Sequence, residues 1–258
     1  MAIRINLNAD MAEGFGAYDI GNDDAMLKVV ASANIACGFH AGDPTIMHRV
    51  VKLAAEEGVS IGAHPGFNDL WGFGRRRIDM RPDDVEYMTA YQIGALQAMT
   101  AYAGVKVTHV KAHGALNNMA AENADYAMAI GRAIRTVDRD LIYVALAGSE
   151  MERAGRELGL RVAREGFCDR QYDEDGNLVS RKLPGAVLHD PKAVVDQVVR
   201  MVLEGEIVTR NGRRIKRQVD TLCVHGDEPS AVAVARAARE GLEAAGVHVV
   251  PLPDLPLS

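Results

Sequence analysis

Short apolar runs alternate with amphipathic stretches along the whole chain. The runs predict strands at residues 3–7, 34–37, 60–63, 106–111, 141–147, 160–165 and 219–224, with an eighth candidate at 247–251. Between them the spacing of apolar positions predicts helices over about 23–33, 43–57, 81–103, 123–137, 149–158, 191–204 and 229–246. Strands that alternate with helices are typical of a parallel sheet built from βα units.

Several of these elements are bounded by residues that start or stop a helix. Asp43 followed by Pro44 offers a cap and a first-turn proline, and Gly58 can take the left-handed conformation that ends the helix. The basic stretch 210–217 contains Asn211–Gly212 and is predicted to be a solvated surface hairpin, or less simply a docking patch.

The alternation runs without a linker or a change of composition, so residues 1–258 are predicted to form one domain. Parallel strands with helical crossovers can close into a (β/α) barrel or remain an open, doubly wound sheet. An open sheet would gather its site residues near one switch point. Because polar residues follow nearly every strand here, we favour the barrel.

Composition narrows the class of protein. The 258 residues carry a formal net charge of −6, which argues against general binding to nucleic acid or to an anionic membrane. No apolar run approaches the ~20 residues of a membrane helix, and the first residues resemble a strand rather than a signal peptide. The three cysteines are far apart, as expected for free thiols in the cytoplasm.

The ends of the predicted strands carry the residues suited to chemistry. Four of the eight histidines lie there beside glycine or proline: His40, His64, His113 and His225. Other polar residues at the strand ends are Asn8, Asp10, Glu13, Arg75, Arg76, Lys111, Asp169, Arg170 and Asp227. A barrel brings all strand ends to one face, where barrel enzymes hold their sites.

Each of these residues also has a structural interpretation. Asp10 could cap a turn, and Asp43 is better explained as a helix cap. One of Arg75 and Arg76 could pair with Asp69 or Asp79.

Asp169 and Arg170 could form an internal ion pair that shapes the mouth of the barrel. Cys37 and Cys223 are expected to pack at strand ends, and none of the three cysteines is expected to act as a nucleophile. The chain has no P-loop, dinucleotide fingerprint, nucleophile elbow, C-x-x-C or H-E-x-x-H motif.

Seven stretches in order resemble one known family. They are INLNADMAEGFG, SANIACGFHAGDP, IGAHPGFNDLWGFGRR, YQIGAL, VKAHGALNN, FCDRQYDEDGNLVSR and CVHGDEPSAV, and they span nearly the whole chain. The chain resembles the LamB/YcsF family on these stretches. It departs from the family pattern at Ala112, where proline is expected, and at Asn117, where tyrosine is expected.

The resemblance implies a seven-stranded variant of the TIM barrel, similar to the barrels of glycoside hydrolases and deacetylases. It also implies ATP-dependent opening of 5-oxoproline to L-glutamate, together with separate subunits B and C of a 5-oxoprolinase. Because no ATP site is recognisable in this chain, we expect ATP to be used by the complex through a partner subunit.

Within that chemistry each strand-end residue can be given a role. Asp10 is the first candidate for the general base, with Glu13 as the reserve, and His64 and His113 are candidates for proton transfer to the leaving nitrogen. Lys111 could stabilise developing negative charge. Arg75, Arg76 or Arg170 could hold a substrate carboxylate. The remaining substrate-binding candidates are Asn8, His40, Asp169, His225 and Asp227.

Two other functions stay open. Asp10, His40 and His64 could hold zinc or another divalent ion in a metal-dependent deacetylase or amidohydrolase. Alternatively, the barrel could be non-catalytic and only bind a metabolite or regulate a partner. The sequence does not set the oligomeric state, and a homo-oligomer is compatible with it.

Overall fold

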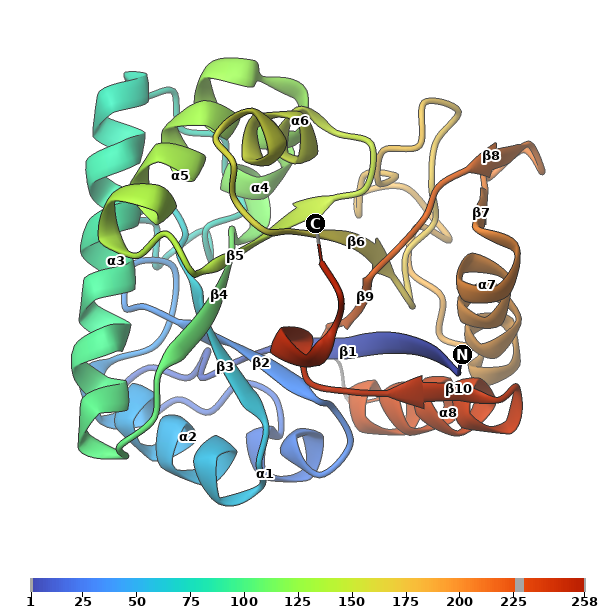
Figure 1. Ribbon diagram of the computed structural model, residues 1–258, viewed down its shortest axis with the longest axis horizontal. Helices are drawn as coiled ribbons and strands as arrows, with labels where there is room; N and C mark the ends of the chain where they lie inside the picture. Colours follow the sequence, from blue (N-terminus) through green and yellow to red (C-terminus); the bar gives the residue numbers. More distant parts are fainter. Residues whose placement is uncertain (1, 226–229, 258) are drawn as a thin grey trace.

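A closed parallel barrel lies at the centre of the computed structural model, which describes residues 2–225 and 230–257 (Figure 1). Within the described residues, seven strands form the barrel in the order β1-β2-β3-β4-β5-β6-β9, and β9 pairs back with β1. The strands are β1 (Ile3–Met11), β2 (Ser32–Ala36), β3 (Ser60–His64), β4 (Val107–Lys111), β5 (Ile142–Leu146), β6 (Val162–Phe167) and β9 (Thr221–Val224). The seven-stranded barrel is therefore confirmed, and the open sheet is excluded.

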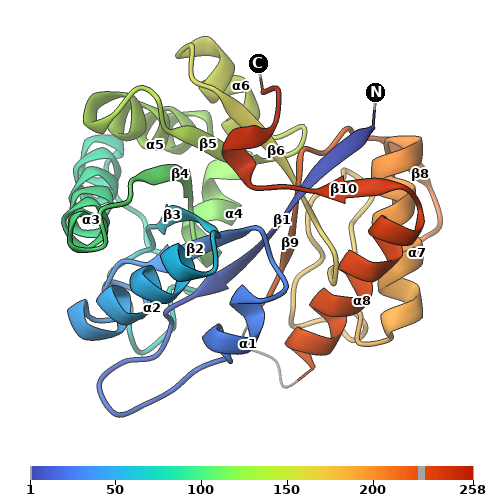
Figure 2. The same ribbon diagram turned by 60° about the horizontal axis from the view of Figure 1, so that its bottom comes forward.

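The helices lie around the outside of the strands (Figure 2). They are α1 (Asp23–Leu27), α2 (Pro44–Glu56), α3 (Pro82–Tyr102), α4 (Gly114–Glu122), α5 (Ala124–Val137), α6 (Glu150–Glu157), α7 (Pro191–Glu204) and α8 (Ala231–Ala244). Within the part of the chain that the structure describes, none of them combines the length and apolar character that crossing a lipid bilayer requires.

The helix caps agree with the sequence. The side chain of Asp43 accepts hydrogen bonds from the N–H groups of Thr45 and Ile46, and Gly58 has a φ of +68°. The predicted hairpin is also present, as antiparallel strands β7 (Glu206–Val208) and β8 (Arg214–Lys216).

Two predictions were wrong at the level of elements. The helix expected over 23–33 ends at Leu27, because Ser32 to Ala36 pair with β1 and β3 as a barrel strand. The α4 helix was missed: it begins immediately after β4 and has no side-chain cap at its start.

The two ends of the chain help to close the barrel at the amino ends of its strands. The beginning of β1 pairs with β10 (Val247–Val249), and the short helix η1 (Leu252–Asp254) follows. Leu252 and Leu255 pack with Ile142, Val144 and Ala163 in a small apolar cluster separate from the main core. The barrel therefore opens toward the carboxyl ends of its strands.

The inside of the barrel is mainly polar. Alternate residues of β1 point inward, and Asn6, Asn8 and Asp10 form three successive levels. The Asn8 side chain donates to Thr221 at 2.7 Å, and Asn34 donates to Asn8 at 2.7 Å and to Asp10 at 2.9 Å.

One more histidine joins this network from β4. Nε2 of His109 lies 3.0 Å from Asn34, and its ring occupies the space left by Gly62, where a Cβ would come within 2.1 Å of it. Burial and the nearby Lys111 lower the pKa of His109 to about 3. Because buried polar groups need hydrogen-bond partners, this network sets the orientation of the residues above it.

Candidate active site

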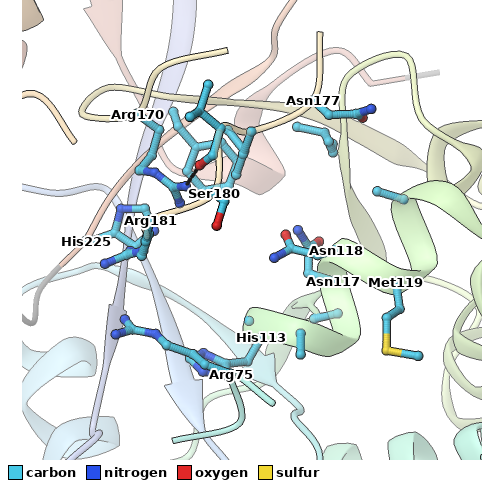
Figure 3. A pocket seen from close by; sticks show the side chains of 18 of the residues that line it. Arg75, His113, Asn117, Asn118, Met119, Arg170, Asn177, Ser180, Arg181 and His225 are labelled. Atoms are coloured by element: carbon cyan, nitrogen blue, oxygen red, sulfur yellow. Dashed lines mark hydrogen bonds between the residues drawn. The ribbon is translucent and has the colours of Figure 1, made fainter. Parts of the chain in front are cut away.

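A cavity of about 540 Å³ occupies the mouth of the barrel (Figure 3). Its walls come from the ends of β1, β4 and β6, from α4, and from the loop over residues 177–182. Among its lining residues are Asp10, Glu13, Arg75, Arg77, Lys111, His113, Asn117, Arg170, Ser180, Arg181, Lys182 and His225. A cavity of this size is typical of small-molecule sites.

An ion pair between Asp10 and Lys111 forms the floor of the cavity. The Nζ of Lys111 donates to both carboxylate oxygens of Asp10, at 2.7 and 3.0 Å, and both side chains are buried. Burial alone would raise the pKa of Asp10, but His64 and Lys111 outweigh it and hold this pKa well below its usual value. Asp10 is therefore an anion that is already engaged, which makes it a weak base.

Glu165 lies beneath this pair and was not predicted as a site residue. Its carboxylate is 3.9 Å from Nζ of Lys111 and accepts a hydrogen bond from Asn8 at 3.4 Å. Burial raises the pKa of Glu165 to about 7, with Lys111 opposing the shift. Asn8, predicted to bind substrate, belongs to this supporting network rather than to the cavity wall.

His225 and Asp169 form a dyad at the edge of the cavity. Nδ1 of His225 lies 2.9 Å from the Asp169 carboxylate, and the ring stacks on Phe167. Burial would raise the pKa of Asp169, but the contact with His225 lowers it below its usual value. A carboxylate that receives the Nδ1 proton leaves Nε2 available to exchange a proton. Asp169 thus pairs with His225 and not, as one prediction had it, with the side chain of Arg170.

Arg170 and Asn117 line the cavity, and each has one buried side-chain atom without a hydrogen-bond partner among the described residues. Arg170 donates to the carbonyl oxygen of Val179 at 2.6 Å, whereas its Nε has no hydrogen-bond partner among the described residues. Burial lowers the pKa of Arg170 to about 10. The Oδ1 of Asn117 is likewise buried without a hydrogen-bond partner in the described part of the chain. Figure 3 shows Asn117 on one side of the cavity and Arg170, with His225, on the other.

The two predicted arginines, Arg75 and Arg76, have different surroundings. Arg75 lines the cavity, and its guanidinium lies 4.9 Å from the centre of the Phe73 ring. Arg76 instead forms an ion pair with Asp69, so the structural alternative is the correct one for this residue. The arginines available to bind a substrate anion in the cavity are therefore Arg75, Arg170 and Arg181, of which Arg181 was not predicted.

Three histidines and one carboxylate converge beside the floor. The potential ligand atoms of Glu13, His40, His64 and His113 lie within 4.8 Å of one another, and all four residues are buried. Burial lowers the pKa of each of the three histidines, most strongly for His40 and His113.

This cluster differs from the predicted set of metal ligands. The sequence suggested Asp10, His40 and His64, whereas in the described structure Asp10 groups with Cys223 and His225 and is held by Lys111. Asp227, another predicted site residue, lies outside the described residues.

Cys37, Cys168 and Cys223 are free and buried, as predicted. Burial raises the pKa of the Cys37 thiol to about 12, and the other two thiol pKa values are also raised. A thiolate nucleophile is therefore disfavoured.

Comparison with known proteins identifies the family of this chain. The LamB/YcsF family model matches residues 5–256. A protein from Rhodopseudomonas palustris, named as the A subunit of 5-oxoprolinase, is 55% identical over 96% of this chain and 98% of its own length. A protein of the same name from Natranaerobius thermophilus is 51% identical over 95% of each chain.

Solved structures agree with the fold. The lactam utilization protein of Thermus thermophilus is 44% identical, with a TM-score of 0.91 over 96% of this chain and 99% of its own. The catalytic domain of a peptidoglycan N-acetylglucosamine deacetylase from Eubacterium rectale is 13% identical, with a TM-score of 0.53 over 100% of this chain and 92% of its own, and so shares the fold alone. The chain therefore belongs to the LamB/YcsF family.

Proposed function

We propose that this chain is the A subunit of a 5-oxoprolinase, which opens the lactam ring of 5-oxoproline to give L-glutamate. The observation that carries the proposal is a cavity whose lining combines the guanidinium-bearing residues Arg75, Arg170 and Arg181 with the amide-bearing Asn117. A guanidinium group is a charged donor suited to a carboxylate, and a side-chain amide such as that of Asn117 offers an acceptor suited to a lactam N–H. 5-Oxoproline carries both groups on one small ring.

Proton transfer is assigned to His225. Asp169 holds its Nδ1, so Nε2 can take a proton from water as the water oxygen bonds to the lactam carbonyl carbon. The same histidine then returns that proton to the ring nitrogen as the C–N bond breaks. This assignment replaces Asp10 as the first candidate for the base, because the ion pair with Lys111 reduces the basicity of Asp10.

Lys111 stabilises the negative charge that develops on the carbonyl oxygen. Its ammonium group is fixed by Asp10, so little reorganisation is needed when the charge appears. Removal of one such preorganised donor typically lowers kcat by ~10²–10³. Asp10 therefore acts by positioning Lys111, and Glu165 supports the pair from below.

ATP enters through partner subunits in this proposal. A five-membered lactam is a stabilised amide whose hydrolysis is slow and only weakly favourable, and this chain contains no P-loop sequence. The relatives are named as one subunit of an enzyme, which supports a complex with further subunits. Subunits B and C would then couple ATP hydrolysis to activation of the lactam.

Reconstitution tests the proposal. The purified chain is mixed with subunits B and C, ATP and 5-oxoproline, and glutamate is measured with each component omitted in turn. Glutamate formation should require all of them. Glutamate formed in the absence of this chain, or by this chain without ATP and partners, would overturn the division of labour.

A variant pair tests the assignment of the base. His225→Gln should lower glutamate formation by ~100-fold or more. The matched control His48→Gln, on the exposed face of α2, should leave it unchanged. Normal turnover in His225→Gln would remove this residue from the mechanism.

A further inference from the structure

The histidine cluster contains two ring nitrogens whose lone pairs face each other. Nδ1 of His64 lies 2.7 Å from the carbonyl oxygen of Lys111, and Nε2 of His113 lies 2.8 Å from the carbonyl oxygen of Phe73. Carbonyl oxygens only accept, so both of these nitrogens carry protons. In the neutral rings the opposite nitrogens, Nε2 of His64 and Nδ1 of His113, carry lone pairs and lie 3.0 Å apart, and Nε2 of His64 also lies 3.3 Å from Oδ2 of Asp10. A positive centre is needed to stabilise this contact.

The other two residues of the cluster, Glu13 and His40, indicate an ion that can bind more atoms than a proton can. Neither ring nitrogen of His40 has a hydrogen-bond partner among the described residues, although its side chain is fully buried. Nε2 of His40 lies 3.4 Å from Oε1 of Glu13, and Nδ1 of His113 lies 3.6 Å from the same oxygen. A proton can bridge two atoms, whereas here four donor atoms converge.

Three of the six separations among the four ligand atoms are close to those of tetrahedral coordination. Zinc–nitrogen bonds of ~2.0–2.1 Å place tetrahedral ligand atoms ~3.3–3.4 Å apart. The separations of 3.0, 3.4 and 3.6 Å surround that value, and all the ligand atoms lie within 4.8 Å of one another. The carbonyl contacts of His64 and His113 are also the outer contacts that usually orient metal-binding histidines.

Backbone strain is concentrated at the same place. Among the described residues, Ala12 and Phe73 are the two non-glycine residues with positive φ, at 58° and 53°. Ala12 precedes Glu13, and the carbonyl of Phe73 holds His113. Such conformations cost energy and are retained mainly at functional sites.

We infer that Glu13, His40, His64 and His113 form a binding site for one divalent transition-metal ion of the zinc class. The inference goes beyond the proposed function, which uses no metal. Glu13 and His113 also line the cavity, which gives an ion a path to the site. A bound ion there would act as a Lewis acid toward an oxygen atom at the floor of the cavity.

Metal binding by the isolated chain tests the inference without partners or lactam. The purified chain is stripped with a chelator, titrated with Zn²⁺ by calorimetry, and analysed for metal content after dialysis. We expect one tightly bound equivalent. Glu13→Gln and His40→Gln should each weaken binding by at least ~100-fold, since loss of an outer contact alone can cost ~10–100-fold. The matched control His48→Gln should bind like the unchanged chain.

Equal affinity in all three variants, or no stoichiometric zinc in the unchanged chain, would overturn the inference. If either cluster variant fails to fold by circular dichroism, Co²⁺ bound to the unchanged chain decides the question. Intense visible absorption of a tetrahedral ion without a sulfur charge-transfer band supports the site. A weak, octahedral spectrum contradicts it.

Discussion

Replacement of Asp10 by asparagine tests the ion pair at the floor of the cavity. The change keeps the shape of the side chain but removes the anion that holds Lys111 through contacts of 2.7 and 3.0 Å. The ammonium group would remain buried, with the Glu165 carboxylate 3.9 Å away. Breaking a buried ion pair by removing one partner typically lowers the free energy of unfolding by ~3–5 kcal/mol.

For a chain of this size, such a loss should lower the melting temperature by about 6–20 °C. If Asp10 were a free general base, Asp10→Asn would leave folding unaffected. The charge on Lys111, rather than the basicity of Asp10, is the quantity that the substitution disturbs.

A double-mutant cycle measures the interaction. Urea unfolding is recorded for Asp10→Asn, Lys111→Met and the double variant, with the slope against urea checked for constancy. The double variant leaves no unpaired charge, so it should be more stable than Asp10→Asn, with a coupling energy of ~2–3 kcal/mol. Glutamate formation by the reconstituted complex should stay at least ~100-fold reduced in the double variant, because the oxyanion donor is missing.

Two outcomes would refute this reasoning. Effects on stability that add within ~0.5 kcal/mol would mean that the two residues do not stabilise each other. Near-normal glutamate formation in the double variant would mean that Lys111 does not stabilise the reacting oxygen.

Three further predictions follow from the site. Burial raises the pKa of Glu165 from the usual 4.5 to about 7, so the folded chain holds this proton more tightly than the unfolded chain does. The free energy of unfolding, relative to that of Glu165→Gln, should therefore fall by ~3 kcal/mol as the pH rises from about 5 to 7 and then level off. A difference in melting temperature that stays constant with pH would contradict this. Arg170→Lys should raise the KM for 5-oxoproline by ~10-fold or more with a smaller change in kcat, because a directed charged donor is lost. Steady-state kinetics of the reconstituted complex measure both constants. An unchanged KM would exclude Arg170 as a substrate-binding residue. Trp71 is 98% exposed on the loop that leads to Arg75, and we expect it to contact a partner subunit. Trp71→Ala should leave the melting temperature unchanged but weaken the association of this chain with its partners in sedimentation experiments. Unaltered association would show that Trp71 is not part of the interface.

Much of the fold was predictable because its signals are local. The helix α7 has the bounds 191–204 that the sequence indicated, since Asp190 and Pro191 start it and Gly205, with a φ of 63°, ends it. The short α1 and the missed α4 show the limit of such signals. Both lie beside barrel strands, and the pairing and packing of those strands decide where the helix ends or begins.

The sequence also determined which residues lie at the mouth of the barrel. His64 and Lys111 are the last residues of their strands, His113 and His225 follow theirs, and parallel strands have their carboxyl ends on one face. Asp10, the last but one residue of β1, likewise lines the cavity. This follows from chain direction alone and needs no knowledge of distances.

Only the tertiary structure decided which of these residues meet. Closure of the barrel brings residues that are far apart in the sequence into contact, and no local pattern encodes these pairs. The pairs are Asp10 with Lys111, Asp169 with His225, and Glu13 with His40. It also brings Glu165, from a strand interior, beneath the site. The physical reason is that partner choice among charged groups depends on separations of a few ångströms in a buried environment, and barrel closure and strand register fix these separations.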